Sequence, residues 1–202
     1  METQFTVKDK KWIQKTIWKT YSKAAENPDG LFRYPTGHEG LKTLKYDPEL
    51  LQALPAEIAA SYCGVGNPFT LGSVDKGDEV LDVGCGAGVD TLFSAMMTGP
   101  TGKVVGIDLT PAMIKRAEKN LSKTDLKNVV FKEGSAENLP FADGDFMIVT
   151  SNGALNLVPD KARAFGEIYR VLKPGGRLMV ADEILTGKLP EEKDKIIKSW
   201  AQ

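Results

Sequence analysis

The sequence has little of what metal centres and disulfide-bonded folds need. Its 202 residues include only two cysteines, Cys63 and Cys85, and one histidine, His38. Neither cysteine belongs to a spaced group of cysteines and histidines, so the pattern predicts no metal site and no disulfide framework. We expect both thiols to be reduced.

Long apolar runs and a net charge are also missing. No apolar stretch approaches the roughly 20 residues that span a bilayer, and the start, METQFTVKDKK, lacks the apolar core of a secretion signal. The 26 basic side chains almost cancel the 27 acidic ones, so no overall field draws the protein to nucleic acid or an anionic surface. We therefore expect a cytoplasmic protein with a small-molecule partner, and neither a nucleic-acid nor a membrane partner.

A helix is predicted over Val7–Ala25. Ile13, Ile17 and Tyr21 recur every four residues and form an apolar stripe. Lys11, Lys15, Lys19 and Lys23 recur at the same step on the opposite side. The pattern suits either a helix lying on a membrane surface or, as we expect, one packed on its own domain with a solvated lysine face.

The next segment, 27–68, is rich in proline, glycine and polar residues and has one helical stretch near Pro48–Ala60. We interpret residues 1–68 as an N-terminal helical lid and residues 69–202 as the main domain. His38 lies in this segment, where we expect an exposed loop rather than a general base folded over a site.

Strand and helix patterns alternate in the main domain, as is typical of an α/β fold with a parallel sheet and crossover helices. Thr110 and Pro111 supply a helix N-cap and first-turn proline, and Lys173–Gly176 is a stop after the helix Lys161–Leu172. The predicted strands are Glu79–Val83, Lys103–Asp108, Asn128–Lys132, Phe146–Ser151 and Arg177–Asp182.

The first of these strands runs into a glycine-rich turn with Gly84, Cys85, Gly86 and Gly88. Glycine lets the backbone approach a ligand closely. A dinucleotide fingerprint would need its third glycine at Val89, so the spacing counts against NAD.

Two aspartates bracket this turn and favour a nucleoside with an ammonium group, as in S-adenosylmethionine. Asp82, at the end of the first strand, suits the ammonium. Asp108, at the end of the second, suits both ribose hydroxyls. The alternative is that Asp108 caps the next helix, but Thr110 is placed for that.

Loops after later strands add polar groups at the same sheet edge. Residues 133–141, GSAENLPF with its preceding glutamate, can bond the edge of an adenine and flank its faces. Ser151 and Asn152 end the fourth strand, where open α/β sheets place ligands. The cofactor-binding set we predict is Asp82, Gly84, Cys85, Gly86, Gly88, Asp108, Leu109, Ser135, Ala136, Glu137, Ser151 and Asn152.

The segments LDVGCGAG, GIDLTPAMI, GSAENLPF, SNGALNLVPD and EIYRVLKPGGRLMVADEI together resemble the class I S-adenosylmethionine-dependent methyltransferases, with their Rossmann-like fold, over about Val74 to Leu185. The segment Tyr62–Pro68 with SNGALNL resembles the arsenite methyltransferase branch. The resemblance implies in-line transfer of a methyl group from S-adenosylmethionine, driven by positioning.

In the arsenite branch, cysteines grip the trivalent metalloid, and one of them matches Cys63, our candidate catalytic residue. The residue-based alternative is that Cys63 is a buried small apolar residue. The second thiol of that pair is absent, because Ser151-Asn152-Gly153 replaces the branch's SNC. One thiol cannot chelate trivalent arsenic, so arsenite is the runner-up acceptor rather than the favoured one, and a thiol is another candidate. The chain also has Ser135 and Met147 where relatives carry acids.

The resemblance also implies two further strands after the fifth, whereas here only a helix-like segment, Pro190–Trp200, follows. We expect an open sheet edge. A truncated form, half of a split protein, a homodimer that pairs this edge and a chain ended at a recoded stop codon remain open. The function predicted is a small-molecule methyltransferase, with a cofactor-binding protein without turnover as the alternative.

Overall fold

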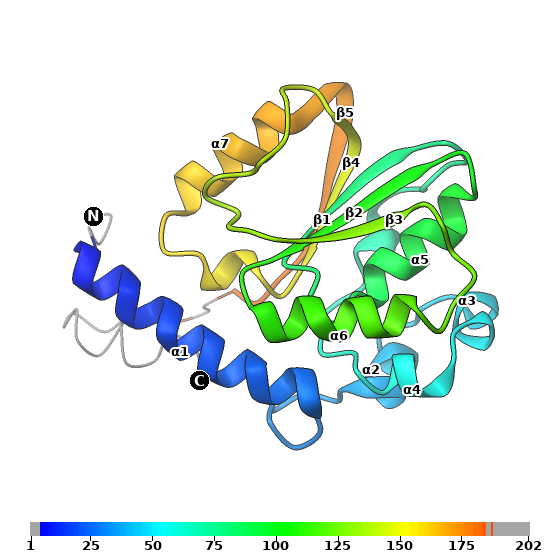
Figure 1. Ribbon diagram of the computed structural model, residues 1–202, viewed down its shortest axis with the longest axis horizontal. Coiled ribbons are helices and arrows are strands. Elements are labelled where there is room, and N and C mark those ends of the chain that lie inside the picture. The colour runs from blue at the N-terminus through cyan, green and yellow to red at the C-terminus, as the bar shows by residue number, and fades with distance from the viewer. Residues whose placement is uncertain (1–4, 185–186, 188–202) are drawn as a thin grey trace.

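The computed structural model describes residues 5–184 and 187 and has a five-stranded, fully parallel sheet in the order β3-β2-β1-β4-β5 (Figure 1). This confirms the predicted α/β class and parallel sheet. The strands are β1 (Glu79–Val83), β2 (Lys103–Asp108), β3 (Val129–Glu133), β4 (Phe146–Asn152) and β5 (Leu172–Ala181).

Helices cover both faces of the sheet, which explains why its central strands are almost continuously apolar. α5 (Val89–Thr98) and α6 (Pro111–Leu121) pack on one face, and α7 (Lys161–Val171) packs on the other (Figure 1). Successive residues of β1 divide between the two cores: Val80 packs with the helix α5 side and Leu81 with the α7 side.

The last strand begins earlier than the sequence predicts. The helix before it ends at Val171, and β5 starts at Leu172, so the proline and glycines that follow lie within the strand rather than in a stop between two elements. The register against β4 shifts between Phe146 and Ile148, which accommodates this irregular segment as a bulge.

The N-terminal helix α1 (Val7–Glu26) forms as predicted. A capping box between Thr6 and Asp9 starts it, Ile13 and Ile17 are buried, and the predicted lysine stripe is exposed to solvent. The helix therefore packs on its own domain. It crosses the carboxyl end of the sheet beside α6 (Figure 1).

The segment between α1 and the sheet contains more helix than predicted: α2 (Gly37–Thr43), α3 (Pro48–Ala53), α4 (Ala56–Ala59) and the 3₁₀ turn η1 (Pro68–Leu71). Pro55 separates α3 from α4, whereas the sequence predicted a single helical stretch there. His38 is exposed on α2 rather than in a loop. Leu41, Tyr46 and Ile58 are buried against the sheet's α5 face.

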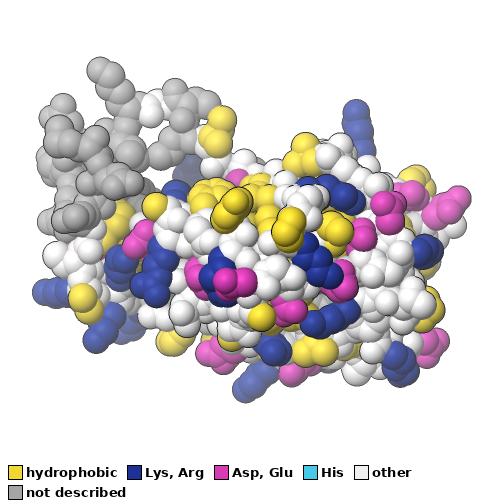
Figure 2. Space-filling view, turned by 90° about the horizontal axis from the view of Figure 1, so that it is seen from above, with side chains coloured by type: hydrophobic (Ala, Val, Ile, Leu, Met, Phe, Trp, Pro, Cys, Tyr) yellow, Lys and Arg dark blue, Asp and Glu magenta, His cyan; other side chains and the backbone are white. Residues whose placement is uncertain are grey.

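One edge of the sheet is formed by β5, and among the described residues no strand pairs with its outer side. Phe165 and Tyr169 on the adjacent α7 are exposed, with 43% and 82% of their surfaces accessible. Figure 2 shows hydrophobic side chains gathered on this side of the molecule, where α7 and β5 lie at the top of Figure 1. The helix expected over Pro190–Trp200 lies outside the described residues. No described helix is long and apolar enough to cross a bilayer.

Candidate functional site

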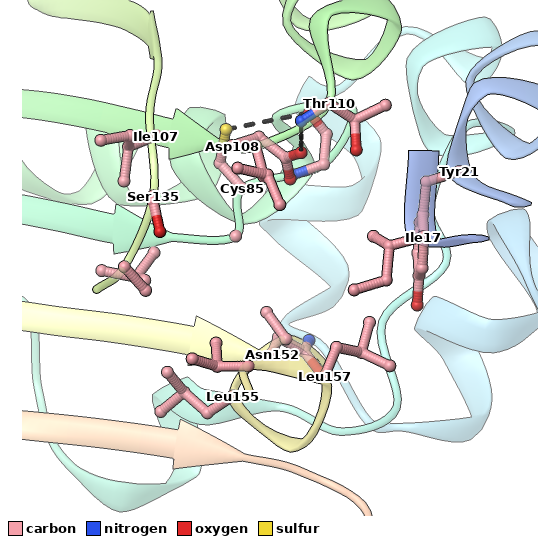
Figure 3. Close-up of a pocket in the computed structure, with 18 of the residues that line it drawn as sticks. Ile17, Tyr21, Cys85, Ile107, Asp108, Thr110, Ser135, Asn152, Leu155 and Leu157 are labelled. Carbon is pink, nitrogen blue, oxygen red and sulfur yellow. Dashed lines mark hydrogen bonds between the residues drawn. The ribbon is translucent and has the colours of Figure 1, made fainter. Parts of the chain in front are cut away.

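A cavity of about 320 Å³ lies at the carboxyl ends of β1, β2 and β4. Open parallel sheets bind ligands at this position. The strand ends form one wall, the 3₁₀ turn η2 (Leu155–Leu157) forms the floor, and Ile17 and Tyr21 of α1 close the opposite side (Figure 3). The predicted lid helix is thus part of the cavity wall.

Within the glycine turn, two glycines permit close packing. Gly84 has φ +74°, and a Cβ there would lie 2.2 Å from the Cβ of Ala154, so the loop after β4 can approach the turn. Gly88 has φ +83°, and its Cβ would lie 2.6 Å from the Phe131 ring. Gly84, Cys85 and Gly86 line the cavity. Gly88 is not among the lining residues, and its lack of a side chain lets α5 pack against β3.

Asp108 joins the end of β2 to this turn. Its Oδ2 accepts a hydrogen bond from the Gly86 N–H at 2.9 Å, and its Oδ1 accepts one from the Thr110 N–H at 2.8 Å. Burial raises the pKa of this carboxyl, and the two backbone donors oppose the rise. Thr110 occupies the N-cap position of α6, but its side chain makes no capping bond, which corrects that part of the prediction.

Asp82 lines the cavity from β1 and is 2% exposed. Its carboxylate accepts hydrogen bonds from the hydroxyls of Thr91, at 2.6 Å, and Thr150, at 3.0 Å. Burial, with a contribution from the nearby Asp90, raises the pKa of Asp82 to about 7. No described cation pairs with it.

Asp90 is a cavity residue for which the sequence analysis assigned no role. It lies in the first turn of α5, is 7% exposed, and accepts hydrogen bonds from the Tyr46 hydroxyl at 2.7 Å and from Asn152 Nδ2 at 2.9 Å. Burial raises its pKa to about 6. The signal that could have found it is its position directly after the glycine turn.

Asn152 connects β4 to the N-terminal segment. Its Oδ1 accepts hydrogen bonds from the N–H groups of Val65, at 2.9 Å, and Gly66, at 3.0 Å. Its Nδ2, which has two protons to donate, lies 2.8 Å from the carbonyl oxygen of Gly66, 2.9 Å from Asp90 Oδ2 and 3.0 Å from the Tyr62 hydroxyl. The side chain lines the cavity and fixes residues 62–66 beside it.

The neighbouring residue Ser151 does not face the cavity. It is fully buried, and its hydroxyl donates to the carbonyl of Val83 at 2.8 Å, so it ties β4 to β1. The prediction that Ser151 lies in the site is therefore wrong. Successive side chains of a strand point to opposite faces, which is why Asn152 reaches the cavity and Ser151 does not.

The predicted adenine segment also reaches the cavity, since Ser135, Ala136 and Glu137 line it, as does Leu109. Two interactions attach helix α1 to this part of the cavity wall. The indole N–H of Trp18 donates to the Leu109 carbonyl at 2.9 Å, and Lys10 Nζ lies 3.8 Å from a carboxylate oxygen of Glu137.

Both cysteines line the cavity. Burial raises the pKa of Cys63 to about 12, with further contributions from Asp108 and Asp90, and burial also raises the pKa of Cys85 well above its usual range. Both thiols are thus protonated at neutral pH. Among the described residues there is no group of side chains that could hold a metal ion, and His38 does not line the cavity.

The strand-end cavity, its glycine turn and its acids define a ligand-binding α/β domain. A family model described as a methyltransferase domain matches residues 74–202. The chain belongs to this family, the class I S-adenosylmethionine-dependent methyltransferases.

Individual relatives differ in the acceptor that their names state. An arsenite methyltransferase from Halobacterium salinarum is 40% identical over 157 residues, covering 78% of this chain and 40% of that protein. A demethylmenaquinone methyltransferase from Listeria monocytogenes serotype 4a is 42% identical over 109 residues, covering 54% of this chain and 46% of that protein. The chain spans less than half the length of these curated relatives.

A solved structure shares the fold. The crystal structure of an arsenic(III) S-adenosylmethionine methyltransferase from Chlamydomonas reinhardtii is 35% identical, with a TM-score of 0.62, and the match covers 68% of this chain and 49% of that one. About two thirds of this chain therefore have a counterpart in an enzyme of known fold.

Proposed function

We propose that the protein binds S-adenosylmethionine in the strand-end cavity and transfers its methyl group to a small molecule. The observation that carries the proposal is the order of the cavity residues across the sheet. Ser135–Glu137 follow β3, Asp108 ends β2, Asp82 and the glycine turn belong to β1, and Asn152 ends β4. With neighbouring strands about 4.8 Å apart, this row has the length of an extended nucleoside with an amino-acid tail.

The residues present fit this cofactor. Ser135, Ala136 and Leu109 offer polar and apolar contacts for an adenine, and Asp108 offers acceptor lone pairs for ribose hydroxyls. Asp82 lacks a described cationic partner although it is buried, which suits a ligand that brings a positive charge.

When bound, S-adenosylmethionine supplies an electrophilic methyl group on a positively charged sulfur. The chain contributes position and exclusion of water. Ile17, Leu155 and Leu157 are apolar walls that keep water from the reacting atoms, and the glycine turn and Asp108 hold the nucleoside in place. An acceptor whose nucleophilic atom is already unprotonated needs no general base.

The acceptor is the finer part of the proposal, and Cys63 bears on it. An arsenite-like or thiol acceptor would meet this single thiol at the cavity wall. A Cys63→Ser variant separates the candidates. If trivalent arsenic is the acceptor, its methylation should fall by more than tenfold while S-adenosylmethionine affinity stays unchanged; a thiol acceptor should be methylated at the parent rate.

The second candidate is a cofactor-binding domain without turnover. It is favoured by the outer side of β5, with which no strand pairs among the described residues. Release of S-adenosylhomocysteine in the presence of candidate acceptors distinguishes an enzyme from a binding protein.

We also propose that residues 1–68 act as a lid shaping the acceptor side and that the protein works in the cytoplasm.

We further propose that a second copy of the chain or a second chain covers the β5 edge. The exposed side chains of Phe165 and Tyr169 near this edge support that proposal. Light scattering on the purified protein gives its mass in solution, and a monomer at micromolar concentration would argue against self-pairing.

A further inference from the structure

The amino-acid end of the cavity contains two buried carboxylates where one would balance one ammonium. Asp82 and Asp90 both line the cavity and are 2% and 7% exposed. Every hydrogen bond given to them comes from a neutral hydroxyl or amide: Thr91 and Thr150 for Asp82, Tyr46 and Asn152 for Asp90. Two negative charges in a poorly solvated place repel each other and remain costly without a cation.

The position of Asp90 relative to the proposed ligand follows from the sheet order. Asp108 and the adenine segment lie at the ends of β2 and β3, whereas Asp90 bonds to Asn152 at the end of β4 and follows the turn after β1. A nucleoside amino acid whose adenine lies at β3 therefore extends its tail toward Asp90.

We propose that Asp90 is a second carboxylate that recognises the ammonium group of the cofactor, together with Asp82. The inference rests on the proposed cofactor and names a further specificity residue for it. Because the ammonium brings one positive charge to the pair, it stabilises the ionised form of both acids.

The hydrogen bonds around Asp90 also connect the proposed ammonium site to the N-terminal segment. The hydroxyls of Tyr46 and Tyr62 and Nδ2 of Asn152 lie 3.0, 2.8 and 2.8 Å from the carbonyl oxygen of Gly66. Tyr46 and Asn152 also lie within hydrogen-bond distance of Asp90, and the single hydroxyl proton of Tyr46 can go to Asp90 or to Gly66. The charge on Asp90 therefore acts on the side chains that place residues 62–66 at the cavity wall. Asp90 is in this way both a ligand contact and an anchor of that wall.

A change of pH should report on the pair. Burial raises the pKa of Asp90 to about 6 and that of Asp82 to about 7. The other titratable groups facing them are Asp108 on β2, Cys85 in the glycine turn, and Tyr46, Tyr62 and Cys63 of the N-terminal segment. None of these is a cation, so the ligand's ammonium should drive protons off the two acids.

The test compares two ligands that differ only at the amino-acid end. S-adenosylhomocysteine carries the ammonium and the carboxylate of its amino-acid tail, whereas 5′-methylthioadenosine has the same adenine, ribose and thioether sulfur without either charge. Asp90→Asn should weaken S-adenosylhomocysteine binding about ten- to a hundredfold and change methylthioadenosine binding by less than about threefold. Asp75→Asn, an exposed aspartate before β1, is the control with the same change in net charge and should alter neither.

Calorimetry at pH 6.5 in buffers of different ionisation enthalpy adds a second readout. The parent should release protons on binding S-adenosylhomocysteine, and Asp90→Asn should release fewer. Equal losses for both ligands, or an unchanged proton release, would overturn the role of Asp90 and leave the cofactor assignment standing. If the parent protein binds neither ligand, the proposed function fails and the role of Asp90 falls with it.

Methylthioadenosine binding also reports whether the variant is folded. If Asp90→Asn does not fold, Asp90→Glu is the second variant, because it keeps the charge but displaces the carboxylate by one methylene. It should still weaken S-adenosylhomocysteine more than methylthioadenosine, and equal losses would again overturn the proposal.

Discussion

Asp108 Oδ2 accepts the backbone N–H of Gly86 at 2.9 Å, so the end of β2 and the glycine turn after β1 form one rigid unit. The Thr110 N–H holds the other carboxylate oxygen, at 2.8 Å. Both oxygens are thereby oriented before any ligand arrives, and an ionised carboxylate has enough lone pairs to accept further hydrogen bonds from a ligand. An acceptor fixed in advance loses little entropy on binding.

Replacing Asp108 with alanine should therefore weaken S-adenosylmethionine binding strongly. We expect a loss of about 2–4 kcal/mol, because two hydrogen bonds to an ionised acceptor disappear. This corresponds to roughly thirtyfold to several-hundredfold in Kd, measured by calorimetric titration. A variant that is folded by circular dichroism and binds as tightly as the parent would contradict the ribose assignment.

The glycine turn offers a prediction about stability. Gly88→Ala must adopt a left-handed φ and place its Cβ 2.6 Å from the Phe131 ring, so the free energy of unfolding should fall by about 2–4 kcal/mol. Gly175→Ala is the matched control, because it has a similar φ of +80° but no atom within 4 Å of the new Cβ. It should cost about 1 kcal/mol in urea unfolding. Equal losses would mean that the contact with Phe131 does not matter.

Asn152 should matter for folding as well as for the site. Asn152→Ala leaves the N–H groups of Val65 and Gly66 without their acceptor and leaves Asp90 with the Tyr46 hydroxyl but without its amide donor. We expect the free energy of unfolding to fall by about 2–4 kcal/mol. Ser151→Ala, the neighbouring control, removes one hydroxyl bond and should cost about 1 kcal/mol. The reverse order of the two losses would contradict the network.

The raised pKa values of Asp82 and Asp90 predict how stability depends on pH. Their folded pKa values, about 7 and about 6, exceed those of an unfolded aspartate, so the folded state holds more protons between about pH 4 and 7. Their contribution therefore favours folding at low pH and is lost as the pH rises through 6 and 7. Urea unfolding of the free protein at pH 5.5 and 8 should show this fall.

Asp82→Asn tests the assignment of that pH dependence. The variant should show a smaller fall in stability between pH 5.5 and 8 than the parent. An unchanged slope would mean that other groups cause it. Glu57, Glu79, Asp160 and Glu167 have lowered pKa values, but their effect lies at lower pH.

The sequence predicted the sheet well because buried strands followed by glycine, proline or capping residues are local signals. The ends of β1 and β2 agree with the prediction to the residue, and they position Asp82 and Asp108. The start of β5 was predicted too late because its proline and glycines normally end a strand. Here a bulge against the neighbouring β4 accommodates them, and that bulge is not a local sequence signal.

The network around Asp90 could not be predicted in the same way. Tyr46 and Tyr62 come from the N-terminal segment, Asp90 from α5 and Asn152 from β4, so their meeting depends on how that segment packs on the sheet. Ser151 and Gly88 were predicted to contact the cofactor because they lie next to cavity residues in the sequence. In the structure the Ser151 hydroxyl bonds to the carbonyl of Val83, and Gly88 packs against Phe131.

Calorimetric titration of the purified, folded protein with S-adenosylmethionine and S-adenosylhomocysteine, with NAD as the control, tests whether the strand-end cavity is a cofactor site. We expect micromolar binding of the two sulfur nucleosides and none of NAD. Binding of NAD, or no binding of either sulfur nucleoside, would contradict it.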